Sequence, residues 1–389
     1  MDTKTTGAGR FAAFDLQAVP SPAFVIDKQK IIENLSVLSQ LQAESGAHIL
    51  LALKAFSMWG MADIISQHLS GCCASGLWEA QLADKYYQGL LSTYSPAYKA
   101  DEIEQIVKLS DHITVNSASQ FHLVHPLAQA EECDIGLRIN PQLMLGEVEK
   151  YDPSAPKSRL GVPLSQLDKT LQDIPIEQLS GLHIHSLCEQ GFDALLQLAE
   201  RLEPVLDRLA PHLSWLNLGG GHMLTHPDYD RAALISYLQQ LKSRYDIQIY
   251  LEPGTAIAFD AGILVGEICD VIDNDGAVAI TDISATCHMP DVLEAPYRPA
   301  LLAEADDGIE VELGGPSCLA GDRIGSYRFA QRPEPGTRIA FLDQAHYSMV
   351  KTTTFNGVRL PAIMIWDSET NQSEILRQFS FADFEHRLS

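Results

Sequence analysis

Lys54 is the residue whose surroundings in the sequence most strongly suggest chemistry. It stands near the end of the largely apolar run HILLALKAF, His48–Phe56. A lysine that a strand carries into a buried place is costly unless its ammonium is paired or deprotonated. That cost is offset where the amine forms a Schiff base with an aldehyde cofactor. For this residue alone, a lysine that reaches out to solvent at a strand end is the open alternative.

A glycine run and a carboxylate follow at positions that suit an anion and a ring nitrogen. Gly219, Gly220 and Gly221 come after a predicted strand and before a predicted helix. Glycine amides and a helix N-terminus together favour a phosphate group. Glu252 ends the next predicted strand, in YLEPGTAI, where a carboxylate would pair with a protonated pyridine nitrogen. A flexible turn and a capping glutamate are the structural alternatives.

Two histidines in GLHIHSLCEQ lie on one face of a predicted strand, because His183 and His185 are two residues apart. Paired histidines suggest a metal, but no third ligand follows at a plausible spacing, and we predict no metal site. A flat imidazole packed on a cofactor ring suits His185 better. For His183 we expect a hydrogen-bonded core histidine.

Two late motifs carry further candidates. The segment ELGGPSCLAGDRIG, Glu312–Gly325, is typical of a shaped loop, and such loops often carry function. In it, Cys318 would serve as a proton donor and Asp322 would receive an amine; an inert turn with a buried thiol is the alternative. In AHYSMVKTTTFNG, the Tyr347 hydroxyl would reach a phosphate, unless it is an ordinary interface aromatic.

The elements that must position these residues alternate between strand and helix from about residue 28 to 262. This pattern over roughly 240 residues favours a (β/α)₈ barrel, with polar residues at the carboxyl ends of several strands. A doubly wound sheet is the alternative. The expected strands lie in His48–Phe56, His112–Asn116, Asp134–Asn140, Leu179–Leu187, Leu213–Gly221 and Ile247–Gly254, and the expected helices lie near Met61–His68, Ala118–His125, Phe192–Leu209 and Asp230–Tyr245.

After about Gly262 the pattern changes to short β-type segments such as GAVAITDIS and TRIAFLD, separated by turn residues. This indicates an antiparallel β-domain. The segment Pro20–Asp27 reads as a strand that joins that sheet. We therefore expect an α/β protein with an N-terminal tail and strand over 1–27, a barrel over 28–262 and a C-terminal β-domain over 263–389.

The amino-acid composition limits the classes of binding partner that we expect. Lys and Arg total 27 against 51 Asp and Glu, a formal charge of −24, which argues against nucleic acid or an anionic membrane and favours cationic small molecules. Solubility accounts for most of these charges. The seven cysteines contain no C-x-x-C pair and read as cytosolic thiols. With no long apolar run and no secretory signal at the start, we expect a cytoplasmic protein.

In this order the motifs resemble those of the fold-type III pyridoxal-phosphate decarboxylases, the ornithine, arginine and diaminopimelate decarboxylase group, from about Pro20 to Phe379. The resemblance implies an alanine racemase-like barrel with pyridoxal 5′-phosphate as cofactor. It implies Lys54 as the cofactor lysine, His185 as the stacking histidine and Glu252 as the partner of the ring nitrogen. The remaining cofactor contacts implied are Gly219, Gly220, Gly221, Gly254 and Tyr347.

The family also implies a homodimer with active sites at its interface, where Cys318 of the partner subunit protonates the carbanion left by carbon dioxide. Two rivals share the fold. Amino-acid racemases pair the ring nitrogen with an arginine, which Glu252 opposes. Decarboxylase-like regulators have lost the cofactor chemistry, and the presence of Lys54 and Cys318 argues against them.

Within the group, the segments SLCEQ, CHMPDVLEAPYRP and DQAHYSMVKTTTFNG resemble the carboxynorspermidine/carboxyspermidine decarboxylases of polyamine biosynthesis. Diaminopimelate decarboxylases have an arginine where this chain has Thr255, a glutamate at Leu319 and a tyrosine at Leu302. The resemblance implies a pocket for a longer, amine-bearing substrate.

We expect substrate ammonium groups to meet Glu189, Asp291 and Asp322. Arg298 would orient one of these acids or meet the substrate carboxylate. A pocket distinguishes one methylene by only about 1–3 kcal/mol, so the choice between carboxynorspermidine and carboxyspermidine stays open. Diaminopimelate or another basic amino acid is the alternative substrate.

Overall fold

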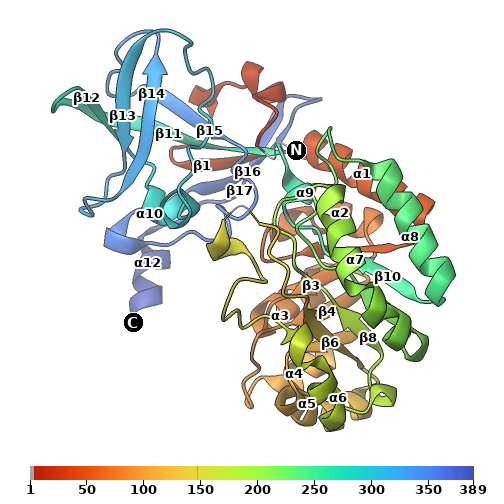
Figure 1. Cartoon of the computed structure of the whole chain (residues 1–389). Helices are drawn as coiled ribbons and strands as arrows, with labels where there is room; N and C mark the ends of the chain where they lie inside the picture. The colour runs from red at the N-terminus through yellow and green to blue at the C-terminus, as the bar shows by residue number, and fades with distance from the viewer. Residues whose placement is uncertain (1–3, 147) are drawn as a thin grey trace. The chain divides into compact units, whose positions relative to one another are not determined.

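The computed structural model describes residues 4–146 and 148–389 (Figure 1). Two compact units divide these residues. We call residues 34–257 the barrel unit, and residues 4–33 with 258–389 the sheet unit. Within the described residues, no helix combines the length and the apolar character that crossing a lipid bilayer requires.

The barrel unit contains a closed barrel of parallel strands, because β10 pairs with β2 and β5 pairs with β6. Around the barrel the strands run in the order β2 (His48–Ala52), β3 (Gly71–Ala74), β4 (Leu90–Tyr94), β5 (His112–Val115), β6 (Asp134–Asn140), β8 (Gly181–His183), β9 (Trp215–Asn217) and β10 (Gln248–Leu251). The short β7 (Val162–Pro163) adds to β6. The predicted (β/α)₈ barrel is confirmed, and the doubly wound sheet is excluded.

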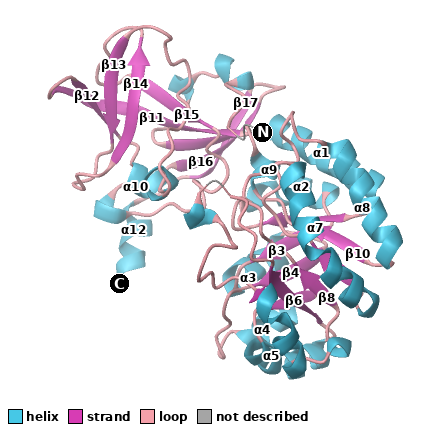
Figure 2. Ribbon diagram, viewed as in Figure 1, coloured by secondary structure: helices cyan, strands magenta, loops and turns pink. Residues whose placement is uncertain are grey.

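Helices lie outside these strands (Figure 2). They are α1 (Lys28–Ser45), α2 (Ala62–His68), α3 (Leu77–Tyr86), α4 (Ile103–Leu109), α5 (Ala118–Glu131), α6 (Leu167–Asp173), α7 (Phe192–Leu209) and α8 (Arg231–Tyr245). In α7 the side chains of Leu195, Leu198 and Leu202 are buried. Their spacing of three and four residues places them on one helix face, which packs inward while the opposite face stays polar.

Trp215 fills the barrel at the end where the strands begin. Its side chain is 2% exposed, and the His112 ring stacks on it with centroids 4.7 Å apart. Gly181, on the neighbouring strand β8, makes room for it: a Cβ there would lie 2.0 Å from Trp215 Cδ2. This aromatic plug leaves the opposite rim, at the carboxyl ends of the strands, as the place for polar side chains.

The sheet unit contains one mixed sheet, ordered β14-β13-β12-β11-β1-β16-β17, with β15 paired to β11. Its strands are β1 (Ala23–Asp27), β11 (Gly262–Asp273), β12 (Ala277–Thr281), β13 (Ile309–Gly314), β14 (Arg323–Phe329), β15 (Arg338–Leu342), β16 (Ala362–Asp367) and β17 (Gln372–Arg377). Most pairings are antiparallel as expected, but β1–β16 and β12–β13 are parallel. The N-terminal strand joins this sheet between β11 and β16.

Short helices complete the chain: α9 (Thr255–Ala258), α10 (Ala285–His288), α11 (Asp291–Glu294) and α12 (Phe381–Leu388). The long strand β11 pairs with two strands in succession, and its pairing with β12 shifts register between Ile268 and Asp270. Its first half pairs with β15 and its second half with β12. Such a bulge bends a strand and redirects the sheet.

Candidate active site

Four adjacent strands bring most of the predicted cofactor residues to one rim of the barrel. In the order β8-β9-β10-β2, their carboxyl ends lead into His185, the glycine run, Glu252 and Lys54. Parallel strands end at the same edge, so residues that are far apart in the sequence meet there. Ala52 N–H donates to Pro253 O at 3.1 Å, which ties the Glu252–Gly254 turn to the strand end that carries Lys54.

Glu252 is the centre of this group and is 5% exposed. His183 Nε2 lies 3.1 Å from its Oε2, and Asn217 Nδ2 donates to its Oε1 at 2.7 Å. His185 Nδ1 lies 3.9 Å from Oε2. Burial by itself raises the pKa of Glu252, but the contacts with His183 and His185 outweigh it and hold that pKa well below the usual range. The result is an ionised carboxylate inside the barrel.

Burial favours the neutral forms of the two imidazoles. Burial lowers the pKa of His183 and lowers that of His185 well below its usual value, with the Lys54 charge adding to the effect. The ligand atoms of His183, His185 and Glu252 lie within 4.8 Å of one another. Glu252 is therefore the third metal-type ligand that sequence spacing did not reveal, because it comes from another strand. The same three side chains also suit a cationic organic ring.

The glycine run lies against His185 and Glu252 with no room for side chains. A Cβ on Gly220 would lie 2.2 Å from Glu252 O, and one on Gly221 would lie 2.1 Å from Leu187 O. Gly221 also has φ +84°, which favours glycine. The expected helix does not follow directly, since α8 begins only at Arg231. Backbone amides, rather than the dipole of that helix, are what this loop offers to an anion.

Lys54 follows β2 on the rim. Its side chain is accessible to solvent, yet enough protein surrounds the amine that desolvation lowers its pKa, and the charge of Arg138 lowers it further. An amine with a lowered pKa is a better nucleophile near neutral pH. These surroundings support a reactive lysine over one that merely reaches out to solvent.

Sequence reasoning missed two polar residues of this rim. Arg138, on β6, is 4% exposed; its Nη2 donates to His185 O at 2.7 Å, and its guanidinium lies 4.4 Å from the Tyr94 ring centroid. Asn217 is fully buried and holds Glu252. A buried arginine within DIGLRIN was a visible signal, because an arginine is rarely buried without partners. Asn217 had no comparable signal.

Glu189 also lies in the barrel unit, where its Oε1 accepts a hydrogen bond from Thr255 Oγ1 at 2.9 Å. Its φ of +51° is uncommon for a residue with a side chain. Thr255 therefore helps to hold the Glu189 carboxylate in place.

The sheet unit carries the other predicted residues. Cys318 is exposed, so the buried-thiol alternative is wrong, and its N–H donates to Asn356 Oδ1 at 2.7 Å. Asp322 is 4% exposed and accepts hydrogen bonds from Ser284 Oγ at 3.0 and 2.9 Å and from Ser317 Oγ at 2.6 Å. Its oxygens thus fix the Cys318 loop. Its contact with a substrate ammonium stays a prediction.

The remaining predicted residues also have partners within the sheet unit. Asp291 pairs with Lys351 Nζ at 2.5 Å. Arg298 Nε donates to Ser326 O at 2.9 Å, and its guanidinium lies 3.9 Å from the Tyr327 ring centroid. Tyr347 has φ +50° and lies beside Lys351, whose Nζ is 5.7 Å from the ring centroid. Their predicted roles toward substrate and phosphate stay predictions.

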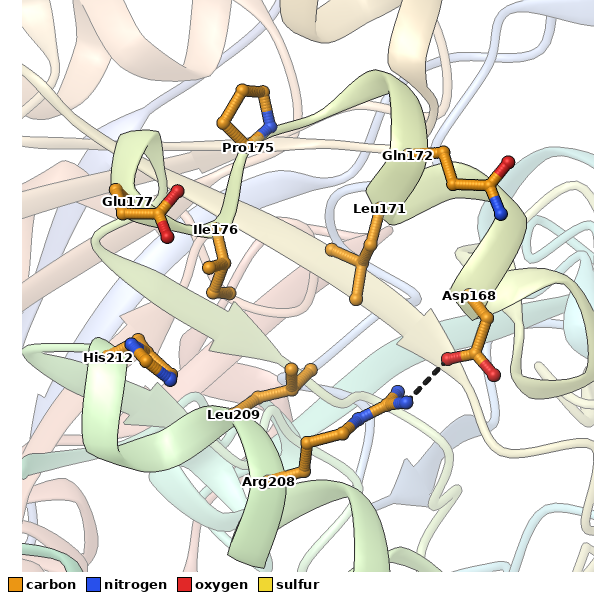
Figure 3. A pocket seen from close by; sticks show the side chains of 9 residues that line it. All are labelled: Asp168, Leu171, Gln172, Pro175, Ile176, Glu177, Arg208, Leu209 and His212. Atoms are coloured by element: carbon orange, nitrogen blue, oxygen red, sulfur yellow. Dashed lines mark ion pairs between the residues drawn. The ribbon is translucent and has the colours of Figure 1, made fainter.

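An open hollow of about 490 Å³ lies elsewhere on the barrel unit. Figure 3 shows its side chains, with an ion pair of 2.6 Å between Arg208 and Asp168. Its lining comes from α6, α7 and the turns after them: Asp168, Leu171, Gln172, Pro175, Ile176, Glu177, Arg208, Leu209 and His212. None of the predicted site residues lines it.

Comparison with known proteins identifies the family of the chain. The family model described as "Pyridoxal-dependent decarboxylase, C-terminal sheet domain" matches residues 23–345. The carboxynorspermidine/carboxyspermidine decarboxylase of Campylobacter jejuni is 37% identical over 95% of this chain and 99% of its own. The carboxyaminopropylagmatine decarboxylase of Synechocystis is also 37% identical, over 96% of each chain.

A solved structure agrees with these relatives. The crystal structure of carboxynorspermidine decarboxylase from Campylobacter jejuni, complexed with norspermidine, superposes with a TM-score of 0.87 at 36% identity, over 95% of this chain and 100% of that one. A match of this extent covers both the barrel and the sheet unit. The chain belongs to the pyridoxal-dependent decarboxylases, enzymes that use pyridoxal phosphate.

Proposed function

We propose that this protein removes carbon dioxide from carboxynorspermidine or carboxyspermidine and so forms norspermidine or spermidine. The observation that carries the proposal is the near full-length likeness to enzymes of that name. The rim supports it, because the buried Glu252 carboxylate and the Lys54 amine occur together there.

The residues of the rim fit pyridoxal phosphate. Lys54 would hold its aldehyde carbon, the amides of the glycine run would face its phosphate, and Glu252 would face its ring nitrogen. The glycine loop leaves no space for a Cβ, and Glu252 keeps its negative charge among neutral donors. When bound, this cofactor supplies an electron-accepting ring that takes up the electron pair left by the departing carbon dioxide.

The protein's own residues would do the rest. Glu252 keeps a negative charge where a positive ring nitrogen is needed, and His185 offers a flat neutral face. Cys318 Sγ–H would give its proton to the carbon that has lost carbon dioxide, and solvent would then return a proton to sulfur. Glu189, Asp291 and Asp322 would meet substrate ammonium groups, with Arg298 orienting an acid or meeting the substrate carboxylate.

A second candidate substrate is carboxyaminopropylagmatine, because the Synechocystis relative of that name is equally identical to this chain. It is distinguished by a guanidinium group, which is planar and donates in a fixed fork, whereas an ammonium is a compact point charge. Carbon dioxide release should therefore be measured on carboxynorspermidine, carboxyspermidine, carboxyaminopropylagmatine, diaminopimelate and ornithine. Highest kcat/KM on diaminopimelate or ornithine would contradict the proposal, and highest kcat/KM on the guanidino substrate would favour the second candidate.

A homodimer with active sites at the interface and a cytoplasmic location belong to the same proposal. All seven cysteines are free thiols, which supports a reducing compartment. If Cys318 acts across the dimer, inactive Lys54→Ala and Cys318→Ala subunits should restore activity when mixed. One site in each heterodimer would then hold both native residues. Subunits that exchange without recovering activity would place both residues in one subunit's site.

A further inference from the structure

We propose that His183 and Asn217 are positioning residues that hold the Glu252 carboxylate as an oriented acceptor for the cofactor's ring nitrogen. The sequence suggested only a core histidine at 183 and nothing at 217. This inference rests on the proposed function to the extent that it requires bound pyridoxal phosphate, but it is independent of which substrate is used.

Three neighbouring strands build the arrangement. His183 ends β8, Asn217 ends β9 and Glu252 follows β10, and the β8–β9 register sets His183 directly beside Asn217. The two donors reach different oxygens of the carboxylate, at 3.1 Å to Oε2 and 2.7 Å to Oε1. Because all three residues are buried, water does not substitute easily for either donor.

The hydrogen-bond network fixes which atoms carry protons. Asn217 Oδ1 accepts from Gly219 N–H at 2.8 Å, so the amide nitrogen must be the atom that faces Glu252. His183 Nδ1 has no hydrogen-bond partner among the described residues. Its proton is therefore on Nε2, where the carboxylate accepts it. Both contacts are hydrogen bonds from a neutral donor to a charged acceptor.

Neutral donors are what this role needs. An arginine or lysine at these positions would neutralise Glu252 and weaken its attraction for a cationic ring nitrogen. His183 and Asn217 each donate a hydrogen bond to one lone pair of the Glu252 carboxylate. The negative charge and the remaining lone pairs of the carboxylate stay available. Lys54 and Arg138 are the cations that act on Glu252 from nearby, and no hydrogen bond of either to the carboxylate is present among the described residues.

A metal ion on His183, His185 and Glu252 is the competing use of these atoms. It would require a lone pair on His183 Nε2 in place of the proton that Glu252 accepts. Asn217 Nδ2, which completes the set around the carboxylate, has no lone pair to give a metal. The protonation pattern therefore favours an organic cation over a metal.

The test uses the holoenzyme and a matched pair of variants. His183→Gln keeps an N–H donor near the position of Nε2, whereas His183→Phe removes it and keeps a ring. Cofactor retention is followed by absorbance and fluorescence during dilution, and the pH dependence of the visible absorbance is recorded. We expect His183→Phe to weaken cofactor binding roughly 10-fold or more, which is the scale of one charge-assisted hydrogen bond, and His183→Gln to restore most of it.

Asn217→Leu provides a second test at the other oxygen and should act in the same direction. In a Glu252→Gln background, the effect of His183→Phe on retention should largely disappear, because the acceptor charge is already lost. Equal losses in His183→Gln and His183→Phe, or full additivity with Glu252→Gln, would overturn the inference. Failure of the substrate panel would contradict the proposed function and leave these cofactor measurements standing.

Discussion

Protonation of His288 is expected to destabilise the sheet unit as the pH falls below neutral. The imidazole is fully buried; its Nε2 donates to Arg359 O at 2.9 Å, and its Nδ1 accepts from Ser284 N–H at 3.2 Å. A proton on Nδ1 would point at the Ser284 N–H and break that contact. Ser284 Oγ also donates to Asp322, so the disturbance reaches the Cys318 loop.

The magnitude follows from linkage. Burial lowers the pKa of His288 to about 4 from its ordinary 6.5. The unfolded chain therefore binds the proton more readily than the folded chain, and stability falls as the pH drops from about 6.5 toward 4. Between pH 7 and pH 5.5 the loss from this one group is about 1.2 kcal/mol. A pH of 5.5 stays above the isoelectric point of about 4.8.

The assay is urea denaturation followed by circular dichroism at several pH values between 5.5 and 8. His288→Gln keeps a donor for Arg359 O but has no group that titrates in this range. It should be less stable than the natural chain at pH 8, and between pH 7 and pH 5.5 its profile should be flatter by about 1.2 kcal/mol. The control is His386→Gln, at an exposed position on α12. A His288→Gln profile parallel to that of the natural chain would refute the reasoning.

Three further outcomes are expected. Lys54→Ala should keep its fold and lose the covalent linkage to cofactor that borohydride fixes, together with nearly all turnover; undiminished decarboxylation would contradict the assignment. Gly181→Ala should lower the free energy of unfolding by about 1–3 kcal/mol or more, because its Cβ would lie 2.0 Å from Trp215. Adding Trp215→Leu should recover part of this loss, as measured by thermal melting. An unchanged melting temperature in Gly181→Ala would be evidence against the plug. Gly221→Ala should release cofactor on dialysis, since its Cβ would lie 2.1 Å from Leu187 O. The control Gly76→Ala should retain cofactor, because a Cβ there would have nothing within 4 Å. Equal retention in the two variants would contradict the close packing of the loop.

The sequence by itself determined the longer elements and the order of the motifs. The three- and four-residue spacing of apolar side chains in Phe192–Leu209 is a local property, and α7 has those bounds. The local pattern of Asp134–Asn140 likewise predicted a strand, and β6 has those bounds. Lys54, the glycine run and Glu252 each follow a strand within a few residues, so the chain itself sets their place on the rim. Short strands such as β3 escaped notice because four residues carry little pattern.

Only the tertiary structure decided which of these residues touch. His183, Asn217 and Glu252 are far apart in the chain and meet because three strands are neighbours in a closed barrel. The parallel pairing of β1 with β16 joins residues 23 and 362, and no local pattern encodes such a contact. Burial then sets the chemistry, because the pKa values and protonation of Glu252 and the histidines depend on neighbours from other strands. Residue types come from the sequence, but desolvation and hydrogen-bond partners exist only once the barrel has closed.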